Sequence, residues 1–153
     1  MNWRVLVHLK PAVVDHRGEH VRREGRLAGL AGVTRVRAGQ AYELAGGLSE
    51  KDARFLADKV LADPVTQEAS VFPADHVRRP QGGRLAEIWL KQGVSDPVAD
   101  TVRLAARDAG LTNLEGVRSG QVFDFFGAAA PAALRRFCED HLMNPLVQTV
   151  EIL

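Results

Sequence analysis

The pentapeptide Val36-Arg37-Ala38-Gly39-Gln40 has a near copy, Val117-Arg118-Ser119-Gly120-Gln121, that begins 81 positions later. No gap is needed to align residues 3–72 with residues 84–153 at this offset. The offset also superposes further identical residues, which are Leu9-Lys10 with Leu90-Lys91, Asp15 with Asp96, Ala28-Gly29-Leu30 with Ala109-Gly110-Leu111, and Pro64 with Pro145. The chain is therefore a tandem duplication, and each copy is interpreted as one structural unit.

The duplication predicts two small units and a connection between them. We place the first repeat at residues 1–72, the linker at residues 73–83 and the second repeat at residues 84–153. Prolines, glycines and charged residues gather in the linker, as is typical of connecting segments. A unit of ~70 residues forms only a marginal core alone. We therefore expect the two repeats to pack on each other and to share buried surface.

Each repeat has the pattern strand–helix–strand–helix–strand. In the first repeat, β-branched and alternating apolar residues predict strands at residues 4–9, 33–44 and 65–72. The second repeat carries the same signals, and its last strand is expected at residues 146–153. The expected fold class is α+β, with two tandem βαβαβ repeats that are ferredoxin-like in spirit and have helices on one face of each sheet.

Capping residues mark the predicted helix ends. Asp96 precedes Pro97, which places a capping carboxylate before a proline at the first helical position. Asp15 is the counterpart of Asp96 in the first repeat. Gly29 and Gly110 stand where a left-handed helix end favours glycine. Ser49 and Asp52 form a variant of the capping box before the second helix.

Apolar stripes predict the buried helix faces. The helix after Asp96 carries apolar residues at steps of four, three and four, namely Val98, Val102, Ala105 and Ala109. The first repeat keeps this stripe only as Val21 and Ala28. The later helices carry the stripes Ala53, Leu56, Ala57, Val60 and Leu61, and Leu134, Phe137, Cys138, His141 and Leu142.

The composition argues against nucleic-acid and membrane proteins. Twenty basic side chains face 19 acidic ones, so the chain lacks the basic excess of nucleic-acid-binding domains. No apolar run approaches the ~20 residues of a membrane span. The single Cys138 excludes an intrachain disulfide and fits a reducing compartment, so we expect a cytoplasmic protein.

A search for catalytic, cofactor and metal motifs finds none. His16 and His20 share a helix face, but no third ligand is placed to complete a metal site. Cys138 and His141 lie in an apolar stripe and are expected to be buried. Phosphate-binding glycine motifs and a Ser/His/Asp set are absent from the sequence. We therefore expect no catalytic residues, no metal and no cofactor.

The longest predicted strand of each repeat is interpreted as a packing element. Its mid-strand Gly39 or Gly120 suggests a bulge, a bend or the close approach of another backbone. Arg37 and Arg118 are candidate contacts at a pseudo-twofold axis or a partner surface, since arginine is enriched in interfaces. The full candidate set for repeat or partner interfaces is Lys10, Arg37, Gly39, Gln40, Lys91, Arg118, Gly120 and Gln121.

Three segments together resemble the PurS family. Residues 10–18 (KPAVVDHRG) resemble its opening K-P-x-V-x-D-x-x-G, and residues 36–44 (VRAGQAYEL) resemble its V-R-x-G-K-x-x-E-L strand. Residues 63–68 (DPVTQE) and 144–148 (NPLVQ) resemble its closing N-P-V-I-E segment. The resemblance covers nearly the whole chain twice, and the order and spacing of the motifs are more specific than any one of them.

The resemblance implies a non-catalytic subunit. PurS is the small subunit of phosphoribosylformylglycinamidine synthase, a ligase of purine biosynthesis that uses ATP and glutamine. Its chemistry belongs to a synthetase subunit, PurL, and a glutaminase subunit, PurQ. The family resemblance implies that this chain bridges the two and assists ammonia transfer. It also implies a homo-oligomer, and a likeness to the N-terminal domain of the large single-chain form.

The chain departs from the family pattern in two ways. Gln40 and Gln121 replace the usual lysine, and one chain contains two repeats where family members are usually single. The chain thus resembles a fused pseudo-dimer, which predicts a dimer of pseudo-dimers. One repeat is expected to face the synthetase, and the other the glutaminase or a second copy. Two alternatives stay open: a fragment of a longer synthetase, and a ligand-sensing regulatory module of the ferredoxin-like (ACT-like) type.

Overall fold

The computed structural model describes residues 1–76 and 80–153, so residues 77–79 of the predicted linker lie outside the described residues. The first repeat forms the elements β1 (Trp3–Leu9), α1 (His16–Leu27), β2 (Val33–Gly46), α2 (Glu50–Leu56) and β3 (Gln67–Pro73). The second repeat forms the elements β4 (Gly83–Leu90), α3 (Pro97–Asp108), β5 (Leu114–Gly127), α4 (Pro131–Phe137) and β6 (Gln148–Ile152).

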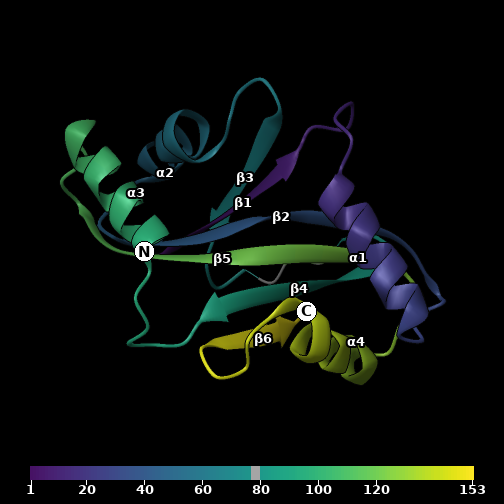
Figure 1. Ribbon diagram of the computed structural model, residues 1–153. Coiled ribbons are helices and arrows are strands. Elements are labelled where there is room, and N and C mark those ends of the chain that lie inside the picture. The colour runs from purple at the N-terminus through teal and green to yellow at the C-terminus, as the bar shows by residue number, and fades with distance from the viewer. Residues whose placement is uncertain (77–79) are drawn as a thin grey trace.

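All six strands join one antiparallel sheet of order β3-β1-β2-β5-β4-β6. The two long strands β2 and β5 lie at its centre, and the helices lie in two pairs at its two ends (Figure 1). The expected βαβαβ repeats and the α+β class are confirmed. However, the sheets of the two repeats are continuous rather than separate, because β2 and β5 pair along almost their full lengths.

The pairing of β2 with β5 relates the two repeats by an approximate twofold axis. Gln40 lies opposite Gln121, which is the same position of the other repeat. Moving outward from this pair, Val36 lies opposite Phe125 and Leu44 lies opposite Val117. The chain is therefore a pseudo-dimer whose interface is a pair of β-strands.

The predicted caps of α1 and α3 are confirmed, and each has a second role. Asp15 accepts a hydrogen bond from the Gly18 amide at 2.8 Å and another from the Ala38 amide of β2 at 2.9 Å. Asp96 does the same with the Ala99 amide at 3.0 Å and the Ser119 amide of β5 at 2.9 Å. Each carboxylate therefore starts a helix and attaches it to a central strand.

The apolar stripes predicted for α1 and α3 need correction. Ala109 and Ala28 are exposed, and Val98 is half exposed. The buried residues are instead Ala99, Val102 and Ala106 in α3, and Gly18, Val21 and Gly25 in α1. The bond from Asp96 to β5 fixes the rotation of α3 about its axis, so the buried face is displaced from the predicted stripe.

The ends of the second helices differ in detail from the prediction. The Ser49–Asp52 capping box is present, and the buried stripe of α2 is confirmed. Each helix continues as one π-helical turn, Ala57–Leu61 or Cys138–Leu142. The strands β3 and β6 begin two residues later than predicted. The reason is that Asp63 and Asn144 accept hydrogen bonds from the amides two residues ahead, which holds a turn there.

Two hydrophobic cores lie between the sheet and the helix pairs, and both repeats contribute to each. In the first core, Val102 and Ala106 of α3 join Trp3, Leu44 and Leu56 of the first repeat. The second core mixes the repeats in the opposite sense, since residues of the first repeat, Val21, Leu30, Val33, Val36 and Ala38, pack on Phe123, Phe125 and Phe137. The helices α1 and α3 thus cover the core of the other repeat, and the expected shared buried surface is observed.

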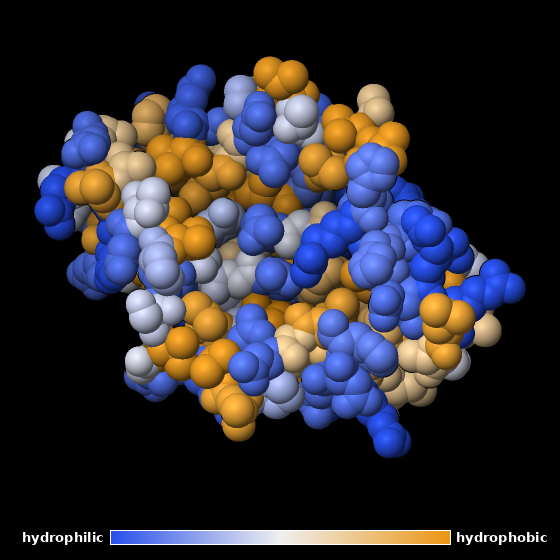
Figure 2. All heavy atoms as spheres, in the orientation of Figure 1, coloured by the Kyte–Doolittle hydropathy of each residue, from blue (hydrophilic) through white to orange (hydrophobic). Residues whose placement is uncertain are grey.

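The helix-bearing face exposes mainly hydrophilic residues over α1, as the space-filling view shows (Figure 2). Only three residues of this twelve-residue helix are buried. In the described part of the chain, no helix is both long and apolar enough to cross a membrane.

Candidate functional site

The face of the sheet opposite the helices carries the polar clusters of interest. A small apolar cluster of Leu6, Ala41, Leu85, Trp89 and Val122 occupies its centre. Buried charged or ionisable residues lie to either side, namely His8 of β1, Glu87 of β4 and Asp124 of β5. The approximate twofold axis relates these two sides, and we call them the closed end and the hollow end.

The closed end is built from Arg4, Glu43, Glu87, Trp89 and Arg118. The Arg4 guanidinium donates to both carboxylate oxygens of Glu87, at 2.7 and 2.8 Å, and to Glu43 at 2.9 Å. The guanidinium carbons of Arg4 and Arg118 lie 4.9 and 4.8 Å from the Trp89 ring centroid. Charge pairing and cation–π contacts therefore fill this end with side chains.

Burial shapes the ionisation of the closed end. It raises the pKa of Glu87, and the attraction of Arg4 offsets this only in part. Burial also works against the charge of Arg4, but its contacts with Glu87 and Glu43 outweigh it and raise the pKa of Arg4. Among the described residues, the Arg4 Nε atom is the one buried side-chain N or O atom without a hydrogen-bond partner. The pair thus keeps Arg4 charged, although burial opposes the charge of both partners.

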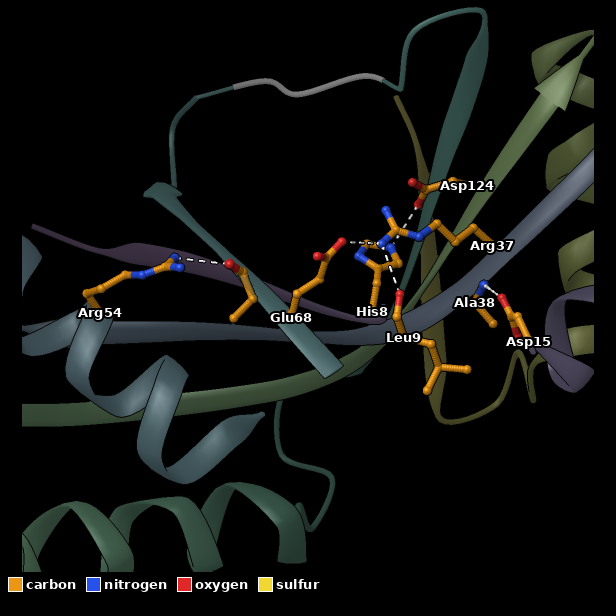
Figure 3. A network of polar contacts seen from close by, with 9 residues as sticks. His8, Leu9, Asp15, Arg37, Ala38, Arg54, Glu68 and Asp124 are labelled. Atoms are coloured by element: carbon orange, nitrogen blue, oxygen red, sulfur yellow. Dashed lines mark hydrogen bonds and ion pairs between the residues drawn. The ribbon is translucent and has the colours of Figure 1, made fainter. Parts of the chain in front are cut away.

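The hollow end contains a pocket of about 390 Å³ that is lined by His8, Arg37 and Asp124, and Glu68 bonds to Arg37 beside it. His8 Nε2 lies 3.3 Å from Asp124 Oδ1, and both side chains are buried. Arg37 Nη2 donates to Glu68 at 2.9 Å and to the Leu9 carbonyl at 3.2 Å. Figure 3 shows these residues approaching one another from different strands. The pocket is completed by Leu6, Ser70, Pro80, Gln81, Leu85 and Phe126.

Divergence of the repeats explains why one end is filled and the other is hollow. In the alignment of the repeats at an offset of 81 positions, His8 stands at the place of Trp89, and Leu85 stands at the place of Arg4. The smaller imidazole leaves space that the indole fills at the closed end. Leu85 also cannot donate a hydrogen bond to Asp124, whereas Arg4 bonds to the equivalent Glu43. The hollow end therefore keeps a pocket in which Arg37 and Asp124 pair with Glu68 and His8 rather than with each other.

The mid-strand glycines Gly39 and Gly120 leave room for the His8 and Trp89 rings of the neighbouring strands. A Cβ atom at residue 39 would lie 2.5 Å from the Val7 carbonyl oxygen and 2.9 Å from His8 Cδ2. A Cβ atom at residue 120 would lie 2.8 Å from Trp89 Cε3. Of the three explanations that the sequence offered for Gly39 and Gly120, close approach of another strand is the one observed.

The remaining candidate interface residues occupy different environments. Lys10 Nζ donates to the Pro64 carbonyl at 2.6 Å within the first repeat. Gln40 is exposed beside the twofold axis, and Gln121 accepts a hydrogen bond from Arg17 at 2.9 Å. Lys91 and Arg118 are exposed and line one surface hollow of about 520 Å³. The fold therefore brings Lys91 and Arg118 together at one hollow, whereas Lys10 and Arg37 bond to different partners, Pro64 and Glu68.

The histidines and the cysteine do not assemble a reactive centre. No three metal-ligating side chains cluster anywhere in residues 1–76 or 80–153. Cys138 is buried as predicted, and burial raises the pKa of its thiol to about 12, which disfavours the reactive thiolate. His141 is not buried as expected. It is half exposed, stacks on Phe137 at 5.0 Å, and lies 3.7 Å from Glu24 of α1.

Sequence reasoning did not single out the residues of the two ends, apart from Arg37 and Arg118. His8 and Asp124 are far apart in the chain and belong to no short motif. A usable signal was the difference between the repeats at equivalent positions. The differences between His8 and Trp89 and between Leu85 and Arg4 mark the place where one end of the pseudo-dimer is filled and the other is open.

Comparison with known proteins identifies the family. The family model PurS, described as phosphoribosylformylglycinamidine (FGAM) synthase, matches residues 2–73 and residues 86–153. The chain belongs to the PurS family. The two PurS matches fall on the two repeats, which confirms the resemblance seen in the motifs and makes the chain a tandem PurS-like protein.

Two solved PurS structures resemble this chain, although no curated protein matches it. One is Methanocaldococcus jannaschii PurS, described as a subunit of formylglycinamide ribonucleotide amidotransferase in the purine biosynthetic pathway. It is 24% identical, has a TM-score of 0.41, and the match covers 46% of this chain and 92% of that one. The other is B. subtilis PurS, which is 25% identical with a TM-score of 0.40 and coverages of 46% and 94%.

Proposed function

We propose that this chain is a non-catalytic assembly subunit of phosphoribosylformylglycinamidine synthase in purine biosynthesis. The observation that carries the proposal is the match of the PurS family model to both repeats. In this role the chain bridges a synthetase and a glutaminase and assists ammonia transfer between them.

The fused pseudo-dimer supports a bridging role. A linker replaces bimolecular association with an effective concentration of order mM, so one chain presents two related surfaces at all concentrations. Because the repeats have diverged, these surfaces are free to bind different subunits. We infer that residues 1–72 and 84–153 each correspond to one PurS unit, that one unit faces the synthetase, and that the assembly is a dimer of pseudo-dimers in the cytoplasm.

The hollow lined by Lys91 and Arg118 is our candidate contact for a catalytic subunit. Both side chains are exposed, and Arg118 combines its contact with the Trp89 ring with a long ion pair to Glu43, at 3.7 Å. Asp96 lies in the same hollow, but its oxygens are occupied by Ser119 and the Ala99 amide. The accessible charge is therefore cationic and suits an acidic segment of the partner.

Reconstitution tests the proposed function. The synthetase and glutaminase of the same genome are mixed with and without this chain, and formation of the product is measured with glutamine or with an ammonium salt as nitrogen donor. We expect glutamine-dependent turnover to require the chain, and ammonium-dependent turnover to require it much less. Glutamine-dependent turnover that is unchanged without the chain would refute the proposal.

A further inference from the structure

We propose that the pocket at the hollow end is a binding site for a small zwitterion of the α-amino acid class. This site lies outside the bridging role, and the isolated chain is sufficient to form it. The pocket draws His8, Arg37 and Ser70 from the first repeat and Leu85 and Asp124 from the second. A bound ligand would therefore contact both repeats.

Arg37 supplies the cationic side of the pocket. Its Nη2 atom is held by Glu68 and by the Leu9 carbonyl, which fixes the guanidinium in place. Its Nε and Nη1 atoms make no hydrogen bond to any described residue. Both planar forks of a guanidinium use Nη2, which is occupied here, so a ligand carboxylate would accept one charge-assisted hydrogen bond, from Nε or from Nη1.

Asp124 supplies the anionic side. His8 occupies its Oδ1 atom and positions the carboxylate, while Oδ2 makes no hydrogen bond to any described residue. An ammonium group is a three-donor cation that can bind this oxygen. Arg37 and Asp124 are directly opposite each other in the β2–β5 register. Opposite residues of antiparallel strands have Cα atoms only ~4.5–5.5 Å apart, so the two charges suit a ligand whose own charges are neighbours.

The rest of the pocket favours a short, largely apolar side chain. Leu6, Leu85 and Phe126 provide apolar walls, and Pro80 and Gln81 border the pocket from the other side. Its volume of about 390 Å³ lies near the lower limit of ~300 Å³ for small-molecule pockets. These dimensions fit one free amino acid rather than a nucleotide or a peptide.

The closed end predicts the stoichiometry. At that end Arg4 bonds to Glu43, the equivalent of Asp124, and Trp89 fills the place of His8. A second site of the same kind is therefore blocked by side chains of the protein itself. We expect one ligand molecule per chain despite the twofold repeat.

Calorimetric titration of the complete chain tests the proposal, with L-alanine, L-leucine and L-glutamine as probes. The matched controls are the N-acetyl amino acids, which lack the ammonium group, and the amino acid amides, which lack the carboxylate. We expect at least one probe to bind at one molecule per chain with a Kd of about 1 mM or tighter, a value that corresponds to −4.1 kcal/mol or better. Both kinds of control should bind at least roughly tenfold more weakly, because each lacks one charge-assisted hydrogen bond.

Two variants in the pocket and one control variant outside it test whether the ligand binds at the hollow end. Arg37→Gln and Asp124→Asn should each weaken binding by roughly ten- to a hundredfold, whereas Arg118→Gln at the closed end should leave it unchanged. Circular dichroism and the thermal midpoint confirm that each variant is folded. Absence of binding by all three probes would overturn the proposal. Equal binding of the N-acetyl or amide forms, or binding that survives in a folded Arg37→Gln variant, would overturn it as well.

Discussion

Gly39 lies against Val7 of the neighbouring strand so closely that a Cβ atom at residue 39 would be 2.5 Å from the Val7 carbonyl oxygen. Backbone and the His8 ring occupy the space, and neither can move far within a central sheet. We expect Gly39→Ala to lower the free energy of unfolding by about 1–3 kcal/mol, as overpacking of a dense interior does.

The matched control for Gly39→Ala is Gly116→Ala in β5. Gly116 also lies in a central strand, but a Cβ atom there would meet only the Ala45 side chain at an ordinary 3.7 Å. Gly116→Ala should be neutral or should stabilise the protein by up to about 1 kcal/mol. Urea unfolding of both variants measures the difference. Equal effects would contradict the close approach as the reason for glycine at residue 39.

The buried pair of Glu87 with Arg4 predicts a pH dependence of stability. Burial raises the pKa of Glu87 above its ordinary value of 4.5 in the folded protein. The unfolded chain therefore ionises Glu87 at lower pH than the folded protein does. As the pH rises from about 4.5 through the raised value, the wild-type protein should lose stability relative to Glu87→Gln, which does not titrate. Urea unfolding at a series of pH values measures this difference, and a difference that grows in favour of wild type would contradict it.

Cutting the linker should leave the two repeats associated. The helices α1 and α3 each cover the core of the other repeat, and β2 pairs with β5 along the centre of the sheet. A protease site inserted after Gln81 allows the cut to be made in the folded protein. We expect the cut halves to migrate together in size-exclusion chromatography at micromolar concentration. Separation of the halves at that concentration would show that the tether, rather than packing, holds them.

Reversal of charge at Lys91 and Arg118 tests the contact proposed for a catalytic subunit. The double variant Lys91→Glu/Arg118→Glu should weaken capture of the synthetase or the glutaminase by at least tenfold, since like charges then face each other. The control is Arg23→Glu/Arg136→Glu, which makes the same change of net charge at exposed helix positions. Circular dichroism checks that both variants are folded, because Arg118→Glu also removes the contacts of Arg118 with Trp89 and Glu43. Equal loss of capture in both would point to net charge rather than to this hollow.

The parts of the fold that depend on neighbouring residues could be predicted from the sequence. Asp15 and Asp96 cap helices, Gly29 and Gly110 have the positive φ angles of left-handed helix ends, and Ser49 begins a capping box. Each of these features is decided within a few residues by backbone geometry. The duplication made these predictions stronger, because a pattern that is clear in one repeat supported its weaker match in the other repeat.

The features that join distant segments could not be predicted. The pattern of an amphipathic helix shows that one face is buried, but not which repeat that face covers. The local sequence therefore does not predict that α1 covers the core of the second repeat and α3 the core of the first. The misplaced stripe of α3 has the same cause, because the bond from Asp96 to Ser119 that fixes its rotation crosses 23 positions. The candidate site depends on contacts at still longer range, such as His8 with Asp124.

The exchange of helices between the cores also affects the order of events during synthesis. The first core requires Val102 and Ala106, and the residues that pack at its border include Leu114 and Val117. A nascent chain that has released the whole first repeat from the ribosome therefore still lacks part of its own core. Folding of the N-terminal half must wait for translation of α3 and β5, and until then its unfinished apolar face is available to chaperones.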